Sequence, residues 1–208
     1  MIFPKEFKEA ISNLPSEEKD KLIFRLLKND LALANQLHFK LVSNQTVEEL
    51  REKVQNQLNI LIERATNNYY SPGYLNMDIR DMSGRINEHV NITKDKYGEI
   101  SLNLYMINRI LEKNNKNILA ASRSKSEKLC TAIIARAFKM LLLIKKMHED
   151  YFMEFENNLR KLGMLIGSND YLMKAAIYNG LDVNWLISGN IPNDIDLIHK
   201  KLRQNGRL

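Results

Sequence analysis

Cysteine is almost missing from this chain of 208 residues, in which Cys130 stands alone. One cysteine excludes an internal disulfide and any metal site that needs several cysteines. Because Cys130 falls on an apolar stripe, we expect it to be a small buried hydrophobic residue rather than a nucleophile. No basic and then apolar leader follows Met1, and the two absences together predict a cytoplasmic location.

Long hydrophobic runs are also missing. Within the helix that we expect at the centre of the fold, the longest uninterrupted apolar run is Met140 to Ile144, which is too short to span a bilayer. Apolar residues nevertheless make up 44% of the chain, so a folded globular protein is expected. No stretch forms a strong catalytic or cofactor motif, and the net charge of +6 gives only a mild preference for acidic partners.

Apolar residues recur at helical spacing along nearly the whole chain, which predicts an all-α protein. We expect eight to ten helices in an antiparallel array, with residues 1–167 forming the main body and 168–208 a small helical cap. The first three helices, between residues 3 and 41, should pack against one another. Thr46 and Glu49 form a capping box at the start of the next helix. The remaining boundaries are predicted from turn-forming and polar stretches, at 69–74, 91–98 and 114–117.

The stretch 126–162 is expected to be one long amphipathic helix, or two helices stacked end to end, at the centre of the array. Its predicted inner face is apolar and consists of Cys130, Ile133, Ala137, Leu141, Ile144, Tyr151 and Phe155. Between residues 116 and 146 there are eight basic residues against one acidic residue, Glu127. Five of the cations fall within about 80° on a helical wheel and form the basic stripe, Lys125, Lys128, Arg136, Lys139 and Lys146.

The basic stripe has two interpretations. It predicts a surface for an acidic protein, an anionic ligand or nucleic acid, and Arg123 among its flanking serines would suit a phosphate. Alternatively it is an ordinary solvated face, which Asp150 and Glu154 continue and on which Lys146 and Asp150 form an i,i+4 pair. The stripe carries no interleaved aromatic residues, which disfavours single-stranded nucleic acid.

Several short motifs resemble an uncharacterised all-helical family of Bacteroidota, and the likeness covers most of the chain. They are Ser71-Pro72-Gly73-Tyr74-Leu75, Asp78-Ile79-Arg80-Asp81, Ile86-Asn87-Glu88-His89-Val90, Ile92-Thr93-Lys94-Asp95-Lys96 and the segment from Asn179 to Leu186. Members of the family sometimes carry a deoxyuridine-triphosphate nucleotidohydrolase label. The resemblance implies an all-helical fold but supplies no catalytic residues.

That label motivates an alternative function, a Mg²⁺-dependent nucleotide pyrophosphatase. All-helical pyrophosphatases hold Mg²⁺ between paired carboxylates on facing helices. The carboxylates that could do so here are Asp78, Asp81, Asp150 and Glu154, and this hypothesis requires them to converge. The leading hypothesis remains a non-enzymatic binding or scaffold protein without a cofactor.

The last forty residues suggest a third function, DNA binding through the cap. Leu181 to Gly189 resembles the closing helix of a repressor-type helix-turn-helix, but the residues before it lack that motif's core. We therefore expect Trp185 to anchor the cap on the core. His38, His89 and His199 are isolated in the sequence, and we expect surface or boundary positions for all three.

Overall fold

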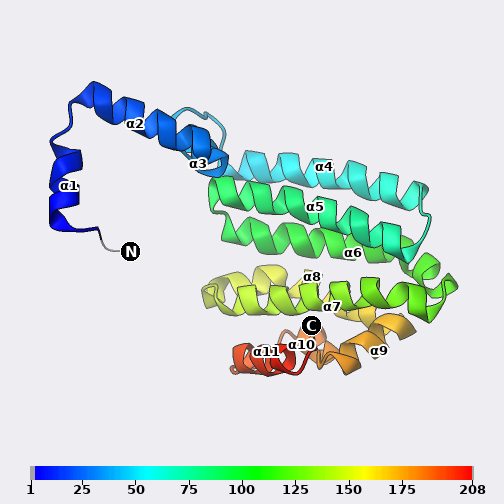
Figure 1. Cartoon of the computed structure of the whole chain (residues 1–208). Coiled ribbons are helices and arrows are strands. Elements are labelled where there is room, and N and C mark those ends of the chain that lie inside the picture. Colours follow the sequence, from blue (N-terminus) through cyan, green and yellow to red (C-terminus); the bar gives the residue numbers. More distant parts are fainter. Residues whose placement is uncertain (1–2, 208) are drawn as a thin grey trace.

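The computed structural model describes residues 3–207, which form helices joined by short connections, with no strand (Figure 1). The all-α prediction is therefore confirmed. None of the helices in this range is long and apolar enough to cross a membrane. The elements are α1 (Lys5–Ser12), α2 (Ser16–Asn29), α3 (Leu31–Leu41), α4 (Val47–Asn67), α5 (Pro72–Thr93), α6 (Lys96–Ala120), α7 (Arg123–Lys145), the short 3₁₀ helix η1 (Glu149–Tyr151), α8 (Phe152–Gly167), α9 (Asp170–Tyr178), α10 (Val183–Ser188) and α11 (Ile195–Gln204).

Helices α4 to α8 run alternately up and down the bundle (Figure 1). Alternate helices are consequently parallel, and their side chains pair at a nearly constant offset in sequence. The amide of Asn108 on α6 donates to the Asn158 carbonyl on α8, and that of Asn115 donates to Leu165 fifty residues later. Short connections between consecutive helices produce this arrangement.

Helix α6 lies at the centre of the bundle and packs against α4, α5, α7 and α8. Buried side chains occur on every side of it, as expected of a helix enclosed by others. The predicted central helix, 126–162, is therefore the wrong one. Polar residues dispersed along α6 obscured its position in the sequence.

The asparagine-rich stretch from Asn114 to Asn117 does not end a helix, as predicted, but lies inside α6. Asparagine is a poor helix former because its amide competes for backbone groups. In α6 these amides bond neighbouring helices instead. Asn114 is fully buried and donates to the Thr66 hydroxyl on α4 at 3.0 Å, and Asn115 donates to α8. Tertiary hydrogen bonds thus override local preference.

The stretch 126–162 is two helices that run in opposite directions, not one helix or two stacked end to end. Helix α7 stops at Lys145, the chain reverses through Lys146 to His148, and η1 leads into α8. The predicted i,i+4 pair between Lys146 and Asp150 does not form. His148 Nδ1 instead lies 3.0 Å from the Asp150 carboxylate. This reversal raises the number of α-helices in the described range to eleven, above the eight to ten expected.

The three N-terminal helices form an arm that extends from the bundle (Figure 1). They do not make the packed array that the sequence predicted, since none of their described residues is buried. Helix α2 packs on α3, and α3 packs on α5, whereas α1 has no substantial contact with another helix. The rest of the chain thus covers α3 in part, but it leaves most of the apolar side chains of α1 and α2 exposed.

The cap formed by α9, α10 and α11 packs on α7 and α8. Trp185 lies edge-on to Phe138 of α7 with ring centroids 6.1 Å apart, as expected of an anchor. Gly163 lies where α8 meets α10. It permits close approach of α10, because a Cβ there would lie 2.6 Å from Ile187 Cγ1. Leu172, Ala176 and Leu186 join the same core as the bundle.

Candidate anion-binding site

The basic stripe does not form one continuous outward surface. Arg136 is half-buried and donates to the Ala132 carbonyl, and its burial and the nearby Arg80 lower the pKa of its guanidinium. Lys139 pairs with Glu99 at 2.7 Å. At the C-terminal end of α7, Lys146 lies 4.0 Å from Asp196 of α11. Three of the five predicted stripe residues are therefore engaged with the protein itself.

The remaining predicted cations gather in the first turns of α7. Arg123, Lys125 and Lys128 are exposed, and none of them takes part in an ion pair within residues 3–207. Ser122 precedes the helix but its side chain caps no backbone N–H. The first N–H groups of α7, which like those of any α-helix have no intrahelical partner, are thus left without a side-chain cap, and this end of the helix favours negative charge.

A groove of about 420 Å³ lies between the start of α7 and helix α9. Arg123, Glu127 and Thr131 line one side of it, and Lys174 lies on the other. Its wider lining also includes the tyrosines Tyr171 and Tyr178, and further Cys130, Ala175, Asn179 and Gly206. The groove thus combines two cations from different helices with hydroxyl and amide groups, and it contains one carboxylate.

The two tyrosines that line this groove are each held by a contact with another part of the chain. The Arg207 guanidinium lies 5.5 Å from the centre of the exposed Tyr178 ring, near the C-terminal end of the described chain. The Tyr171 hydroxyl donates to the Ala121 carbonyl, which fixes its ring beside the start of α7. Cys130 forms part of the floor and is buried, as predicted, and burial raises the pKa of its thiol to about 11.

A second hollow of about 370 Å³ adjoins the other side of the α7 start and is lined by Lys125, Ser122 and the turn after α4. Tyr69 of that turn is half-buried, and its hydroxyl donates to the Asn117 carbonyl at 3.3 Å. Tyr70 and Tyr74 remain exposed and contact each other edge to face. Tyr69 therefore closes the end of the α4 and α6 pair, while the other two rings face water.

The four carboxylates proposed for Mg²⁺ do not converge. Asp78 and Asp81 lie in the second and third turns of α5, where Asp81 pairs with Arg85 at 3.7 Å. Burial, and to a smaller extent Asp81, raise the pKa of Asp78, which also feels Arg64. Within residues 3–207, no group of three metal-binding side chains is present.

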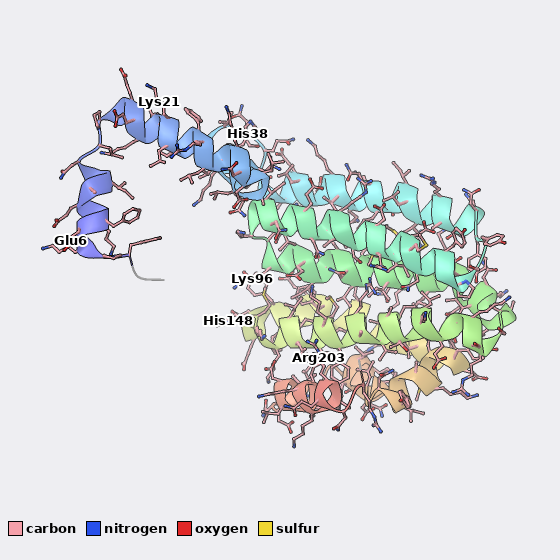
Figure 2. All side chains as sticks on the ribbon, viewed as in Figure 1. Glu6, Lys21, His38, Lys96, His148 and Arg203 are labelled. Atoms are coloured by element: carbon pink, nitrogen blue, oxygen red, sulfur yellow. The ribbon has the colours of Figure 1, made fainter. Side chains whose placement is uncertain are left out.

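Asp150 and Glu154 lie at the opposite end of the bundle, beside the start of α6. Figure 2 labels their neighbour His148 close to Lys96. Fifteen residues of helix separate Asp78 from Thr93 at that end, a span of about 22 Å. Glu154 is moreover engaged by Tyr97, whose pKa is raised by burial and by this hydrogen bond. The pyrophosphatase site is therefore not assembled.

A buried polar cluster that the sequence patterns did not predict lies at this same end and is formed by Arg51, His89, Asp95 and Tyr97. Asp95 Oδ2 accepts from Arg51 Nε at 2.7 Å and lies 3.1 Å from His89 Nε2. Its other oxygen accepts from the Gly98 N–H at the start of α6. The Arg51 guanidinium also stacks 4.7 Å from the Tyr97 ring centre. This polar cluster joins α4, α5 and α6.

The electrostatics of the polar cluster are those of a structural ion pair. Burial acts to raise the pKa of Asp95, but hydrogen bonds from His89, Arg51 and Gly98 outweigh it and lower the value to about 2. The prediction of a surface or boundary position for His89 is wrong, since its side chain is almost fully buried. The buried residues Ile79, Met82 and Ile86 recur at helical spacing, and position 89 continues that spacing. The sequence pattern therefore indicated that His89 is buried.

The likeness to a helix-turn-helix gains no support from the cap. Helix α10 has six residues and no cation, and its Val183 and Leu186 are buried.

Comparisons with protein-family models, with curated proteins and with solved structures give no match.

Proposed function

We propose that this protein is a non-enzymatic cytoplasmic binding protein that takes up a compact anionic ligand, of the phosphate class, at the start of α7. The observation that carries the proposal is the convergence of Arg123 and Lys174, from α7 and α9, on one groove of about 420 Å³. Arginine and lysine together suit a phosphate, since one offers a fork of donors and the other a point charge.

Other features of the groove agree with an anionic ligand. Within residues 3–207, neither Arg123 nor Lys174 forms an ion pair, so a ligand would not have to displace one. Tyr178 and Thr131 add hydroxyl groups, and Tyr178 also offers an exposed ring. Glu127 lies on the same wall as Arg123 and favours a ligand that also carries a hydrogen-bond donor. The cytoplasmic part of the proposal is supported by the single, buried cysteine.

A compact ligand is favoured over a long polyanion. Nucleic acid would need a track of free cations along α7. The later stripe residues Lys139 and Lys146 face Glu99 and Asp196 instead. The free cations that remain are confined to the first two turns of the helix, which is the size of a phosphate site rather than of a strand.

Calorimetric titration with inorganic pyrophosphate at low ionic strength tests the proposal. We expect saturable binding by the native protein, and a dissociation constant at least about tenfold higher for Lys174→Glu, because a charge-assisted hydrogen bond is worth about 1.5–3 kcal/mol. Lys96→Glu is the matched control, since Lys96 is exposed at the opposite end of the bundle (Figure 2). Equal losses in both variants would indicate a general charge effect and reject the site.

A further inference from the structure

The arm leaves uncovered a large apolar surface on helices that cannot be stable alone. Helix α1 has eight residues, has no substantial contact with another helix and buries none of its described side chains. Isolated helices shorter than about 12–15 residues are marginal in water. Figure 2 shows α1, marked by Glu6, far from the bundle. A surface that covers its apolar side chains would therefore stabilise α1.

The apolar area of the arm is that of a protein interface. Phe7 is 49% exposed and Phe24 is 64% exposed, and eight more large apolar side chains of the arm are also exposed. These ten residues are Phe3, Phe7, Ile11, Ile23, Phe24, Leu26, Leu31, Leu33, Leu41 and Val42. If each side chain carries about 150 Å², they expose on the order of 800 Å² together. A standard interface buries about 800 Å² on each partner.

Charge placement on α1 indicates which partner fits. The ring of Phe3, which lies just before the helix begins, packs against the Phe7 ring with centroids 5.6 Å apart. At about 100° per residue, Phe7 and Ile11 lie about 40° apart on α1, and Glu6 and Lys8 lie on opposite flanks of Phe7. In a parallel pair of identical helices related by a twofold axis, the two flanks face each other crosswise. Glu6 of each copy then lies on the same side of the pair as Lys8 of the other copy.

We propose that the arm is a dimerisation element, in which α1 pairs in parallel with α1 of a second copy of this chain and the apolar faces of α2 and α3 extend the contact. The charge balance of the arm agrees, because residues 3–44 contain seven basic and six acidic residues and two arms do not repel each other. A membrane surface fits less well, since helices that bind lipid headgroups have a polar face rich in lysine and arginine.

Sedimentation of the full chain at micromolar concentration tests this proposal. The native protein should sediment at twice the 24.3 kDa of one chain. Phe7→Glu should yield a single chain with unchanged thermal unfolding of the bundle, because Phe7 makes no core contact. Met164→Glu, which changes an exposed apolar residue of α8, is the matched control and should remain a dimer.

Charge exchange tests the parallel pairing itself. Glu6→Lys and Lys8→Glu should each weaken the homodimer, because each places like charges on facing flanks. An equimolar mixture of the two variants should form a heterodimer, in which both facing pairs are again opposite in sign. A native protein that sediments as one chain, a Phe7→Glu variant that stays dimeric, or a mixture that does not associate would overturn the proposal.

Discussion

Arg51 Nε donates a 2.7 Å hydrogen bond to Asp95 Oδ2 across 44 residues of sequence. Arg51 lies in the second turn of α4, and Asp95 precedes the first residue of α6. Since His89 near the end of α5 also contacts the same oxygen, one carboxylate fixes three helices at this end of the bundle. The polar cluster is thus a structural element of the core, remote from the proposed anion site.

Replacing Asp95 should destabilise the bundle strongly. Asp95→Ala leaves Arg51 without its buried partner and removes the bond from Gly98 N–H, and the expected loss is about 3 kcal/mol in the free energy of unfolding. Urea denaturation followed by circular dichroism measures it. Asp182→Ala removes an exposed helix cap at α10 and should cost only about 1 kcal/mol.

The polar cluster should also make stability depend on pH in the acid range. The pKa of Asp95 is about 2 in the folded protein, below its ordinary value of 3.8, so its ionised form is favoured by folding. This contribution is complete above about pH 4 and is lost as the pH falls towards 2, with a total of about 2 kcal/mol.

Comparing the native protein with Asp95→Asn isolates that contribution. The difference in unfolding free energy between the two should shrink as the pH is lowered from 4 to 2, because the native carboxyl becomes neutral as well. A difference that stays constant over this range would show that Asp95 does not titrate with a lowered pKa.

Gly98 should tolerate no side chain. A Cβ at this position would lie 2.0 Å from Asp95 Oδ2 and 3.0 Å from Arg51 Nε, so Gly98→Ala must displace the ion pair. We expect a loss of about 2 kcal/mol. Gly84→Ala on α5 is the matched control, since a Cβ there meets nothing within 4 Å. That control should be neutral or stabilising by up to about 1 kcal/mol, and thermal unfolding distinguishes the two.

Asn114 should contribute to the stability of the bundle through its buried amide. Asn114→Ala removes a fully buried amide that bonds Thr66 on α4, with an expected cost of about 1–2 kcal/mol in chemical denaturation. Asn67→Ala, at the exposed end of α4, should change the unfolding free energy by less than about 0.5 kcal/mol. Equal effects would mean that the asparagines of α6 do not hold the helices together.

Local patterns predicted the helices well where packing and propensity agree. The capping box at Thr46 and Glu49 forms with both of its hydrogen bonds. The burial of Cys130 and the contact of Trp185 with the core also follow from the periodicity of apolar residues. In each of these cases the determining interactions lie within a few residues of one another or on one apolar face.

The errors arose where distant partners decide the structure. The sequence around Asn114 predicts the end of a helix, because its hydrogen-bond partner Thr66 is distant in the sequence. The reversal after Lys145 has no proline or glycine to mark it. Arg136 and Lys139 belong to the basic stripe on a wheel, yet α5 and α6 occupy that side of α7. Lys174, which completes the proposed site, could not be associated with Arg123 before the packing of α9 on α7 was known.

Nuclear magnetic resonance of the ¹⁵N-labelled protein, titrated with inorganic pyrophosphate, tests the proposed function most directly because it locates the bound anion. The proposal predicts saturable shifts in the backbone amides at the start of α7, residues 122–131, and on the facing part of α9, residues 171–179. Shifts centred instead on Lys139, Lys146 or α11, or no shift at low ionic strength, would contradict an anion site between α7 and α9.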